Sequence, residues 1–180
     1  MNQATSKAEL RRQLIAARRA LAPEIKAEAD ARIVAKLLPC LQANHIHVLG
    51  AYLAIAGEPD MSALYELLPA HGITVAMPVV LEREQPLVFV QWRPGDALSK
   101  DASGTLAPSE RGAYLRPDAV LAPCIGYTDQ NLRLGFGGGY FDRTLAQDPR
   151  PRAVGIAYTF ARVSFDAEAH DIPLDIILTD

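Results

Sequence analysis

Cysteine is scarce in this chain, with Cys40 and Cys124 the two examples among 180 residues. They form no C-x-x-C pair and stand in apolar surroundings, which is typical of small buried side chains and argues against a disulfide scaffold. There is no excess of basic residues either: the net charge is -3, which argues against a nucleic-acid partner bound through a basic surface. No apolar run approaches membrane-spanning length, and the polar start from Met1 to Arg12 lacks the apolar core of a signal peptide. We therefore expect a cytoplasmic protein that does not bind a membrane.

Two common phosphate-binding loops are also missing. The pattern G-x-x-x-x-G-K-[ST] does not occur. A dinucleotide fingerprint would need a third glycine where Tyr140 stands, and an acidic residue where Ala157 and Tyr158 stand. Any phosphate site in this chain must therefore be built in another way.

The rest of the composition is that of an ordinary folded protein, with 49% hydrophobic and 22% charged residues. At 180 residues the chain fits one domain, so we predict a single domain over residues 1–180. Apolar runs alternate with helical spacings, which predicts a three-layer α/β/α domain around a mostly parallel sheet. Helices are expected at 6–21, from Pro23 onward with Ile25 on the buried face, at 61–70 and 139–147, and as a short turn near 160–165. Strands are expected at 46–54, at 73–77 with Pro78 ending the strand, and at 87–92, 119–125, 153–158 and 174–178.

The stretch 94–117 shows no clear period and is rich in glycine, proline, serine and charged residues. We predict a long surface loop here with at most one helical turn. Loops of this length are often functional.

Glycine is concentrated in one stretch, Arg133-Leu134-Gly135-Phe136-Gly137-Gly138-Gly139-Tyr140-Phe141-Asp142-Arg143. Four glycines in five positions permit positive φ angles and a close approach of the backbone to a ligand. The spacing after the glycines predicts a helix that opens directly from the loop, so that amide N–H groups converge on an anion. Arg133 and Arg143 add positive charge, and the Asp142 carboxylate is explained best by Mg²⁺ lying between it and a phosphate. A plain glycine-rich turn is the simpler alternative, but the arginines and the aspartate favour phosphate binding.

Other candidate positions carry less weight alone. Lys7, Arg11 and Arg18 fall on one stripe of the first helix, where charges are more often a solvated rim than a site. Glu58 follows the first strand, where open α/β sheets place their ligands, although loop carboxylates are more often solvated. Asp171 precedes the last strand in a segment that a following proline constrains.

Together these pieces resemble the 5-formyltetrahydrofolate cyclo-ligase family, also called 5,10-methenyltetrahydrofolate synthetase. The resemblance covers nearly the whole chain, and its specific part is the signature R-x-G-x-G-x-G-[YF]-[YF]-D. The matching positions are Lys7-x-x-x-Arg11, Glu58, Arg133 to Asp142, His170-Asp171 and Asp175.

The resemblance implies a compact three-layer α/β fold and an enzyme that uses ATP and Mg²⁺. The implied reaction converts 5-formyltetrahydrofolate into 5,10-methenyltetrahydrofolate, with release of ADP and phosphate. Catalytic roles are implied for Arg133, Lys7 and Arg11, and Mg²⁺ ligation for Asp142 and Asp171.

The resemblance also implies which residues touch the two substrates. ATP contacts are implied for Lys7, Arg11, Arg133, Leu134, Gly135, Phe136, Gly137, Gly138, Gly139, Tyr140 and Phe141. Folate contacts are implied for Arg11, Leu53, Glu58, Phe136, Gly137, Gly138, Gly139 and Tyr140. The expected partners are thus small molecules, and we expect a monomer.

The chain departs from the family pattern at two positions. Gly138 stands where some relatives carry a lysine, so that cation must come from elsewhere or be absent. Asn131 replaces a glycine that is common before the signature. Because asparagine tolerates the left-handed region, we expect the turn to persist.

Two other functions remain open from the residues alone. An RNA-binding module is suggested by a loose likeness of Arg133 to Phe141 to an aromatic-glycine motif, which must lie on a strand of a small four-stranded sheet. A sugar-phosphate isomerase or binding domain would need an anion site but no ATP. Dependence on Mg-ATP separates the isomerase from the cyclo-ligase.

Overall fold

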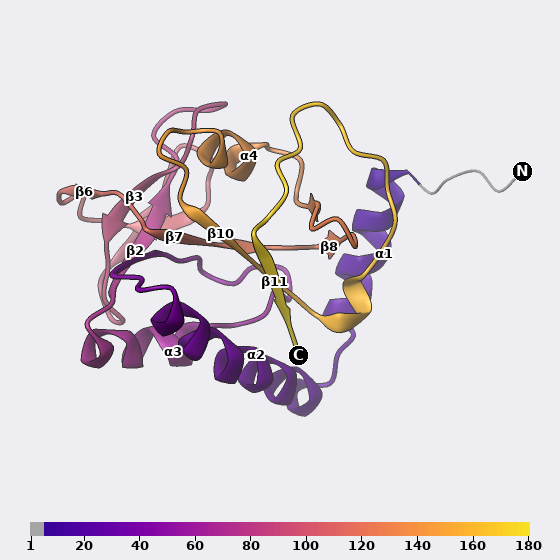
Figure 1. The fold of residues 1–180 in the computed structure, drawn as a ribbon, viewed down its shortest axis with the longest axis horizontal. Helices are drawn as coiled ribbons and strands as arrows, with labels where there is room; N and C mark the ends of the chain where they lie inside the picture. The colour runs from indigo at the N-terminus through magenta and orange to yellow at the C-terminus, as the bar shows by residue number, and fades with distance from the viewer. Residues whose placement is uncertain (1–5) are drawn as a thin grey trace, which may run out of the picture.

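The computed structural model describes residues 6–180; Met1 to Thr5, the first part of the polar start, lie outside the described residues. Within that range a seven-stranded sheet forms the centre of the molecule (Figure 1). Five neighbouring strands are parallel, and the last two strand pairings, at one edge, are antiparallel. This confirms the mostly parallel sheet. The order is β11 (Ile176–Thr179), β10 (Arg152–Ala157), β7 (Ala119–Pro123), β1 (Val48–Gly50), β2 (Thr74–Val79), β3 (Val88–Gln91) and β6 (Tyr114–Leu115).

Helices cover both faces of the sheet, which confirms the predicted three-layer α/β fold. In Figure 1, α2 and α3 lie below the sheet, α4 lies above it, and α1 stands beside β8. The alternation of side chains in the parallel strands supports both layers: Leu121 packs with α2 and α3, while its neighbour Val120 packs toward α4. The helical elements are α1 (Lys7–Arg19), α2 (Pro23–Ala43), α3 (Ser62–Leu67) with the 3₁₀ turn η1 (Leu68–His71), α4 (Tyr140–Leu145) and the 3₁₀ turn η2 (Thr159–Ala161).

The first two helices begin where the sequence predicted. The Ser6 side chain accepts a hydrogen bond from the Glu9 amide and caps α1, and Pro23 occupies the first turn of α2. The expectation for Ile25 was wrong, because its side chain is 52% exposed. The buried stripe of α2 begins only at Ala29, so the first turn of the helix extends past the core.

Most strand ends differ from the prediction by one or two residues, and the differences at the ends of β2 and β1 have a clear structural reason. Pro78 does not end β2, which continues to Val79. The Trp92 amide donates to the Val75 carbonyl. Because the backbone groups of alternate residues point to opposite neighbouring strands, the nitrogen of Pro78 faces β1 and not β3, and β1 has already ended at that level. The missing N–H of Pro78 therefore removes no hydrogen bond from the sheet. β1 stops at Gly50 rather than at residue 54. The Ala51 amide still donates to the Ala76 carbonyl, but at Tyr52 a side chain replaces the backbone partner, because the Tyr65 hydroxyl donates to the Tyr52 carbonyl at 2.9 Å.

The stretch 94–117 is not a structureless loop, and it holds no helical turn. It contains a two-stranded ribbon of β4 (Leu98–Lys100) and β5 (Leu106–Pro108), followed by the edge strand β6. Asp101 closes the ribbon, because its carboxylate accepts hydrogen bonds from the amides of Ser103 and Thr105 and from Val80 of the main sheet. The ribbon is thereby fixed beside the carboxyl end of β2.

A second ribbon leads into the glycine stretch. It pairs β8 (Gly126–Tyr127) with β9 (Arg133–Leu134), and its turn contains Asn131 at φ 59°. The left-handed turn predicted for Asn131 is confirmed. The Asn131 carbonyl also accepts the Leu174 amide at 3.0 Å, which ties the turn to the chain just before β11.

Replacing Asn131 by alanine should therefore lower the free energy of unfolding by about 1 kcal/mol, because alanine lacks the tolerance of asparagine for this region. Asn131→Gly should leave stability unchanged or raise it. Urea unfolding measures both, with Gln130→Ala in the same turn as a matched control. An alanine variant as stable as the wild type would contradict this account.

Candidate active site

A cavity of about 370 Å³ lies at the carboxyl ends of β1, β2 and β7. This is the edge at which open α/β sheets place their ligands, and the volume suits a small-molecule site. The structure brings every site residue that the family resemblance implies to its wall, whereas Arg143, which the sequence placed beside the anion site, does not line it. The implied residues at the wall are Lys7, Arg11, Leu53, Glu58, Arg133, Leu134, Gly135, Phe136, Gly137, Gly138, Gly139, Tyr140, Phe141, Asp142 and Asp171.

The glycine stretch forms a loop between β9 and α4, as predicted. Gly137 and Gly139 have φ angles of 96° and 65°, so side chains there would strain the backbone. Two of its glycines also make room for arginines. A Cβ at Gly135 would overlap the Arg133 guanidinium, and one at Gly139 would lie 2.8 Å from Nη1 of Arg143. The loop therefore holds two guanidinium groups against its own backbone, and Nη2 of Arg143 donates to the Gly138 carbonyl at 2.6 Å.

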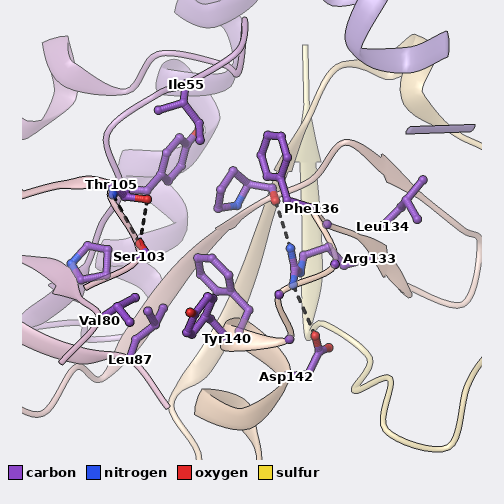
Figure 2. A pocket seen from close by; sticks show the side chains of 18 of the residues that line it. Ile55, Val80, Leu87, Ser103, Thr105, Arg133, Leu134, Phe136, Tyr140 and Asp142 are labelled. Carbon is purple, nitrogen blue, oxygen red and sulfur yellow. Dashed lines mark hydrogen bonds and ion pairs between the residues drawn. The ribbon is translucent and has the colours of Figure 1, made fainter. Parts of the chain in front are cut away.

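Arg133 lies at the centre of the site, between Phe136 and Asp142 (Figure 2). Its Nη2 is 3.4 Å from the Asp142 carboxylate, and its Nη1 is 3.4 Å from the Pro123 carbonyl. Its guanidinium carbon lies 4.8 Å from the centre of the Phe141 ring, within the range of a cation–π contact. The side chain of Leu134, in contrast, packs in a hydrophobic cluster with Leu10 and Leu14 of α1 and points away from the cavity. Only its backbone can serve a ligand.

The N-terminal helix contributes two cations to the cavity, where the basic stripe alone favoured a solvated rim. Lys7 Nζ lies 2.9 Å from Asp171 and 2.8 Å from Glu168. Burial disfavours the ammonium, but the two carboxylates outweigh it and raise the pKa of Lys7. Arg11 Nε donates to the Gly135 carbonyl at 2.7 Å, which fastens α1 to the glycine loop. These two residues are therefore part of the cavity wall and not a solvated rim.

Glu58 is buried, with 2% of its side chain exposed, so it is not a solvated loop carboxylate. Its Oε2 accepts the Ile55 amide at 2.9 Å. Burial raises the pKa of Glu58 to about 7, against the opposing effects of the Ile55 amide, Arg18 and Arg133. A buried carboxylate that titrates near neutrality at a cavity wall indicates a ligand-binding role.

The two predicted Mg²⁺ ligands face the same cavity. Asp142 pairs with Arg133 and Asp171 with Lys7, and both carboxylates are partly buried. The described residues contain no cluster of three or more histidine, cysteine or acidic side chains that could hold a metal. Two carboxylates nevertheless fit Mg²⁺, which commonly takes one or two from the protein and completes its octahedron with water and substrate phosphates.

The sequence did not single out the wall opposite the glycine loop. Figure 2 shows Val80, Leu87, Ser103 and Thr105 there, with Ile55 above them. This wall comes from the end of β2, the chain before β3 and the turn of the β4–β5 ribbon. The run Asp101-Ala-Ser-Gly is a turn signal that could have revealed the hairpin, but nothing local places that turn beside β2.

The RNA-binding alternative required the aromatic-glycine stretch to lie on a strand of a small four-stranded sheet. Only Arg133–Leu134 is a strand, and it pairs in a two-stranded ribbon outside the main sheet. The glycines themselves form a loop. This alternative is therefore wrong in its structural premise.

Helices of membrane-crossing length and apolarity are not found in residues 6–180. Cys40 and Cys124 are both free, and Cys124 is buried as expected, but Cys40 is only partly buried, which corrects the expectation for that residue.

Residues 3–180 match the model of the 5-formyltetrahydrofolate cyclo-ligase family. The 5-formyltetrahydrofolate cyclo-ligase of Mycoplasma pneumoniae is 30% identical over 174 residues, which cover 95% of this chain and 96% of that protein. The Escherichia coli K12 protein of the same name is 28% identical over 170 residues, covering 90% and 93%.

Solved structures agree with this match. The 5,10-methenyltetrahydrofolate synthetase of Mycoplasma pneumoniae aligns with a TM-score of 0.76 at 28% identity, over 97% of this chain and 99% of that one. The solution structure of the Aquifex aeolicus 5,10-methenyltetrahydrofolate synthetase gives a TM-score of 0.79 at 26% identity, over 96% and 88%. Sequence and fold thus agree over nearly the full length.

Proposed function

The chain belongs to the 5-formyltetrahydrofolate cyclo-ligase family, and from that premise we propose that it closes the ring of 5-formyltetrahydrofolate to 5,10-methenyltetrahydrofolate at the expense of ATP. One observation carries the proposal. One cavity is lined by groups that are far apart in the sequence: cations from α1, the glycine loop, a buried glutamate and two aspartates. A sugar-phosphate isomerase would need an anion site alone, and the family match does not favour it.

The glycine loop, Arg133, Lys7 and Arg11 would seat the triphosphate. Loop amides and guanidinium groups suit phosphate oxygens, whereas α4 is only six residues long and adds little dipole of its own. The cavity wall is nevertheless rich in acid. Three cationic side chains face five acidic ones, namely Lys7, Arg11 and Arg133 against Glu58, Asp101, Asp142, Glu168 and Asp171. A polyanion therefore needs a divalent cation here, and Asp142 and Asp171 would hold Mg²⁺.

The chemical problem is the formyl oxygen, because hydroxide is a poor leaving group. In the proposed reaction this oxygen attacks the γ-phosphorus, the bond to the β–γ bridging oxygen breaks, and ADP leaves. N10 then attacks the activated carbon, the carbon–oxygen bond breaks, phosphate departs, and the N10 proton is released. Mg²⁺, when bound, neutralises phosphate charge. The protein would mainly align the γ-phosphate with the formyl oxygen and stabilise the spreading charge through Arg133, Lys7 and Arg11.

The folate would lie toward Leu53 and Glu58, with Phe136 to Tyr140 between the pterin and the nucleotide. The Glu58 carboxylate can accept hydrogen bonds from N–H groups of the reduced pterin, which is a binding role and not that of a base. Phe136 is 51% exposed, so a large aromatic surface remains free for a ligand ring.

The purified protein should form methenyltetrahydrofolate from 5-formyltetrahydrofolate only when Mg²⁺ and ATP are both present, with one ADP per product. The rise in absorbance of the product and a coupled ADP assay measure this directly. Omission of ATP and chelation of the metal are the matched controls. Product formed equally without nucleotide, or no product at all, would overturn the proposal.

The small-molecule partners follow from this reaction. A monomer in the cytoplasm remains our prediction for the state in which the enzyme works. Sedimentation equilibrium tests the first part, and a mass of two chains would contradict it.

A further inference from the structure

Arg18 shares the stripe of α1 with Lys7 and Arg11, but its side chain is 2% exposed and does not reach the cavity. Both terminal nitrogens, Nη1 and Nη2, are buried and find no hydrogen-bond partner among residues 6–180. A buried guanidinium with unpaired nitrogens is strongly destabilising. Burial accordingly lowers the pKa of Arg18, with Glu58 as the main opposing influence. Such a residue calls for a role beyond packing.

Arg18 holds the turn that carries Glu58. Its Nε donates to the Ala56 carbonyl at 2.8 Å. The Glu58 amide closes the turn on the Ile55 carbonyl at 2.9 Å, with Ala56 at φ 49° and Gly57 at φ 77°. An alanine at positive φ persists only where its surroundings hold it in place. The bond from α1 supplies that restraint.

The same guanidinium lies beside the Glu58 carboxylate and the glycine loop. Its Nη2 is 3.9 Å from Oε1 of Glu58, and its central carbon lies 5.7 Å from the centre of the Phe136 ring. The other charge that acts on Glu58 is Arg133 of β9. The remaining titratable neighbours are neutral, since burial raises the pKa of each of them; these are Tyr52, Tyr65 and Cys124.

We propose that Arg18 is a positioning residue for the Glu58 carboxylate: it anchors the Ile55–Glu58 turn to α1, favours the ionised form of the carboxylate and presents it to the cavity. The inference rests on the proposed binding of folate by Glu58. It explains why a charge is buried where no ligand reaches it. Arg18 acts through Glu58 and touches no substrate.

Three variants test this role. Arg18→Met removes both the charge and the bond to Ala56. Arg18→Gln removes the charge but keeps an amide nitrogen at the place of Nε, so the turn remains bonded. Arg19→Met, the exposed neighbour on α1, is the matched control. Carboxyl ¹³C NMR, with the Glu58 signal assigned from Glu58→Gln, gives the titration of Glu58 in each protein without any substrate.

The Glu58 midpoint should move up by about one pH unit or more in Arg18→Met and Arg18→Gln, and stay unchanged in Arg19→Met. The acid limb of kcat/KM for 5-formyltetrahydrofolate should move by the same amount, with KM rising more than kcat falls at neutral pH. If Arg18→Met does not fold, Arg18→Gln carries the test. An unchanged Glu58 midpoint in Arg18→Gln overturns the inference. So does a fall in activity with the acid limb in place, because that is the sign of a merely structural residue. If the Glu58 midpoint shifts but the protein has no cyclo-ligase activity, the role of Arg18 is supported and the proposed function is contradicted.

Discussion

Replacing Arg133 by alanine is expected to lower kcat by about a thousandfold or more, while the protein stays folded. Arg133 is the cation at the centre of the cavity, held by Asp142, the Pro123 carbonyl and the Phe141 ring. A pre-positioned guanidinium stabilises phosphoryl charge that develops in the transition state more than it stabilises bound ATP. The loss should therefore fall mainly on kcat and only weakly on the KM for ATP. Asp142→Ala should give a similar loss, because it removes both a proposed Mg²⁺ ligand and the partner of Arg133.

The controls for this experiment are available on the same chain. Arg162 forms an exposed ion pair with Asp129 outside the cavity, so Arg162→Ala should retain full activity. Arg133→Lys keeps a charge but loses the planar fork, and it should fall between the wild type and the alanine variant. Circular dichroism confirms that each variant is folded. A normal kcat in folded Arg133→Ala would remove this residue from the mechanism.

The positions of the candidate site residues agree with the sequence analysis better than the strand boundaries do. The glycine loop, its two arginines and Asp142 are close in the sequence, so their local chemistry could be interpreted without a fold. Glu58 and Asp171 could be placed because a parallel sheet brings the ends of its strands to one edge. The family resemblance then joined Lys7 and Arg11 to them, and all these residues except Arg143 line one cavity.

What could not be predicted depends on packing between distant segments. The strands of the β4–β5 ribbon have three residues each, too few to show a period, so the ribbon resembled a loop. Arg18 and Arg19 are neighbours of the same type, yet one is buried and the other exposed. Helical spacing places them on different faces of α1, but only the position of the Glu58 turn against α1 explains why Arg18 is buried and not part of a solvated rim. The same contact turns Glu58 from an ordinary loop acid into a buried one.

Replacing Glu58 by glutamine should lower kcat/KM for 5-formyltetrahydrofolate by about a hundredfold. Glutamine offers one acceptor oxygen, and its NH₂ group would face N–H donors of the pterin. The loss should appear mainly in the KM for the folate and leave the KM for ATP nearly unchanged, because Glu58 is assigned to the pterin. Steady-state kinetics with each substrate varied in turn measures both constants. An unchanged folate KM would contradict the assignment.

The same substitution should have a second, opposite effect on stability. In the folded protein Glu58 keeps its proton up to about pH 7, whereas in the unfolded chain this glutamate has its ordinary pKa of 4.5 and releases the proton earlier. Between these two pH values the folded state binds more protons, so the free energy of unfolding falls as pH rises. Glu58→Gln lacks this titration. The free energy of unfolding of Glu58→Gln, relative to that of the wild type, should therefore increase by up to about 3 kcal/mol as the pH rises from 4.5 to 7.

Urea unfolding of both proteins at pH 4.5 and pH 8 measures this change. Glu66→Gln, the same substitution at an exposed site on α3, controls for the loss of one charge. If the difference in free energy of unfolding between Glu58→Gln and the wild type stays constant with pH, ionising Glu58 in the folded protein carries no free-energy cost. If instead Glu58→Gln is less active but more stable than the wild type above pH 7, the Glu58 carboxylate opposes folding and is present because the ligand needs it. The destabilising buried charge of Glu58 would then identify this residue as part of the folate site.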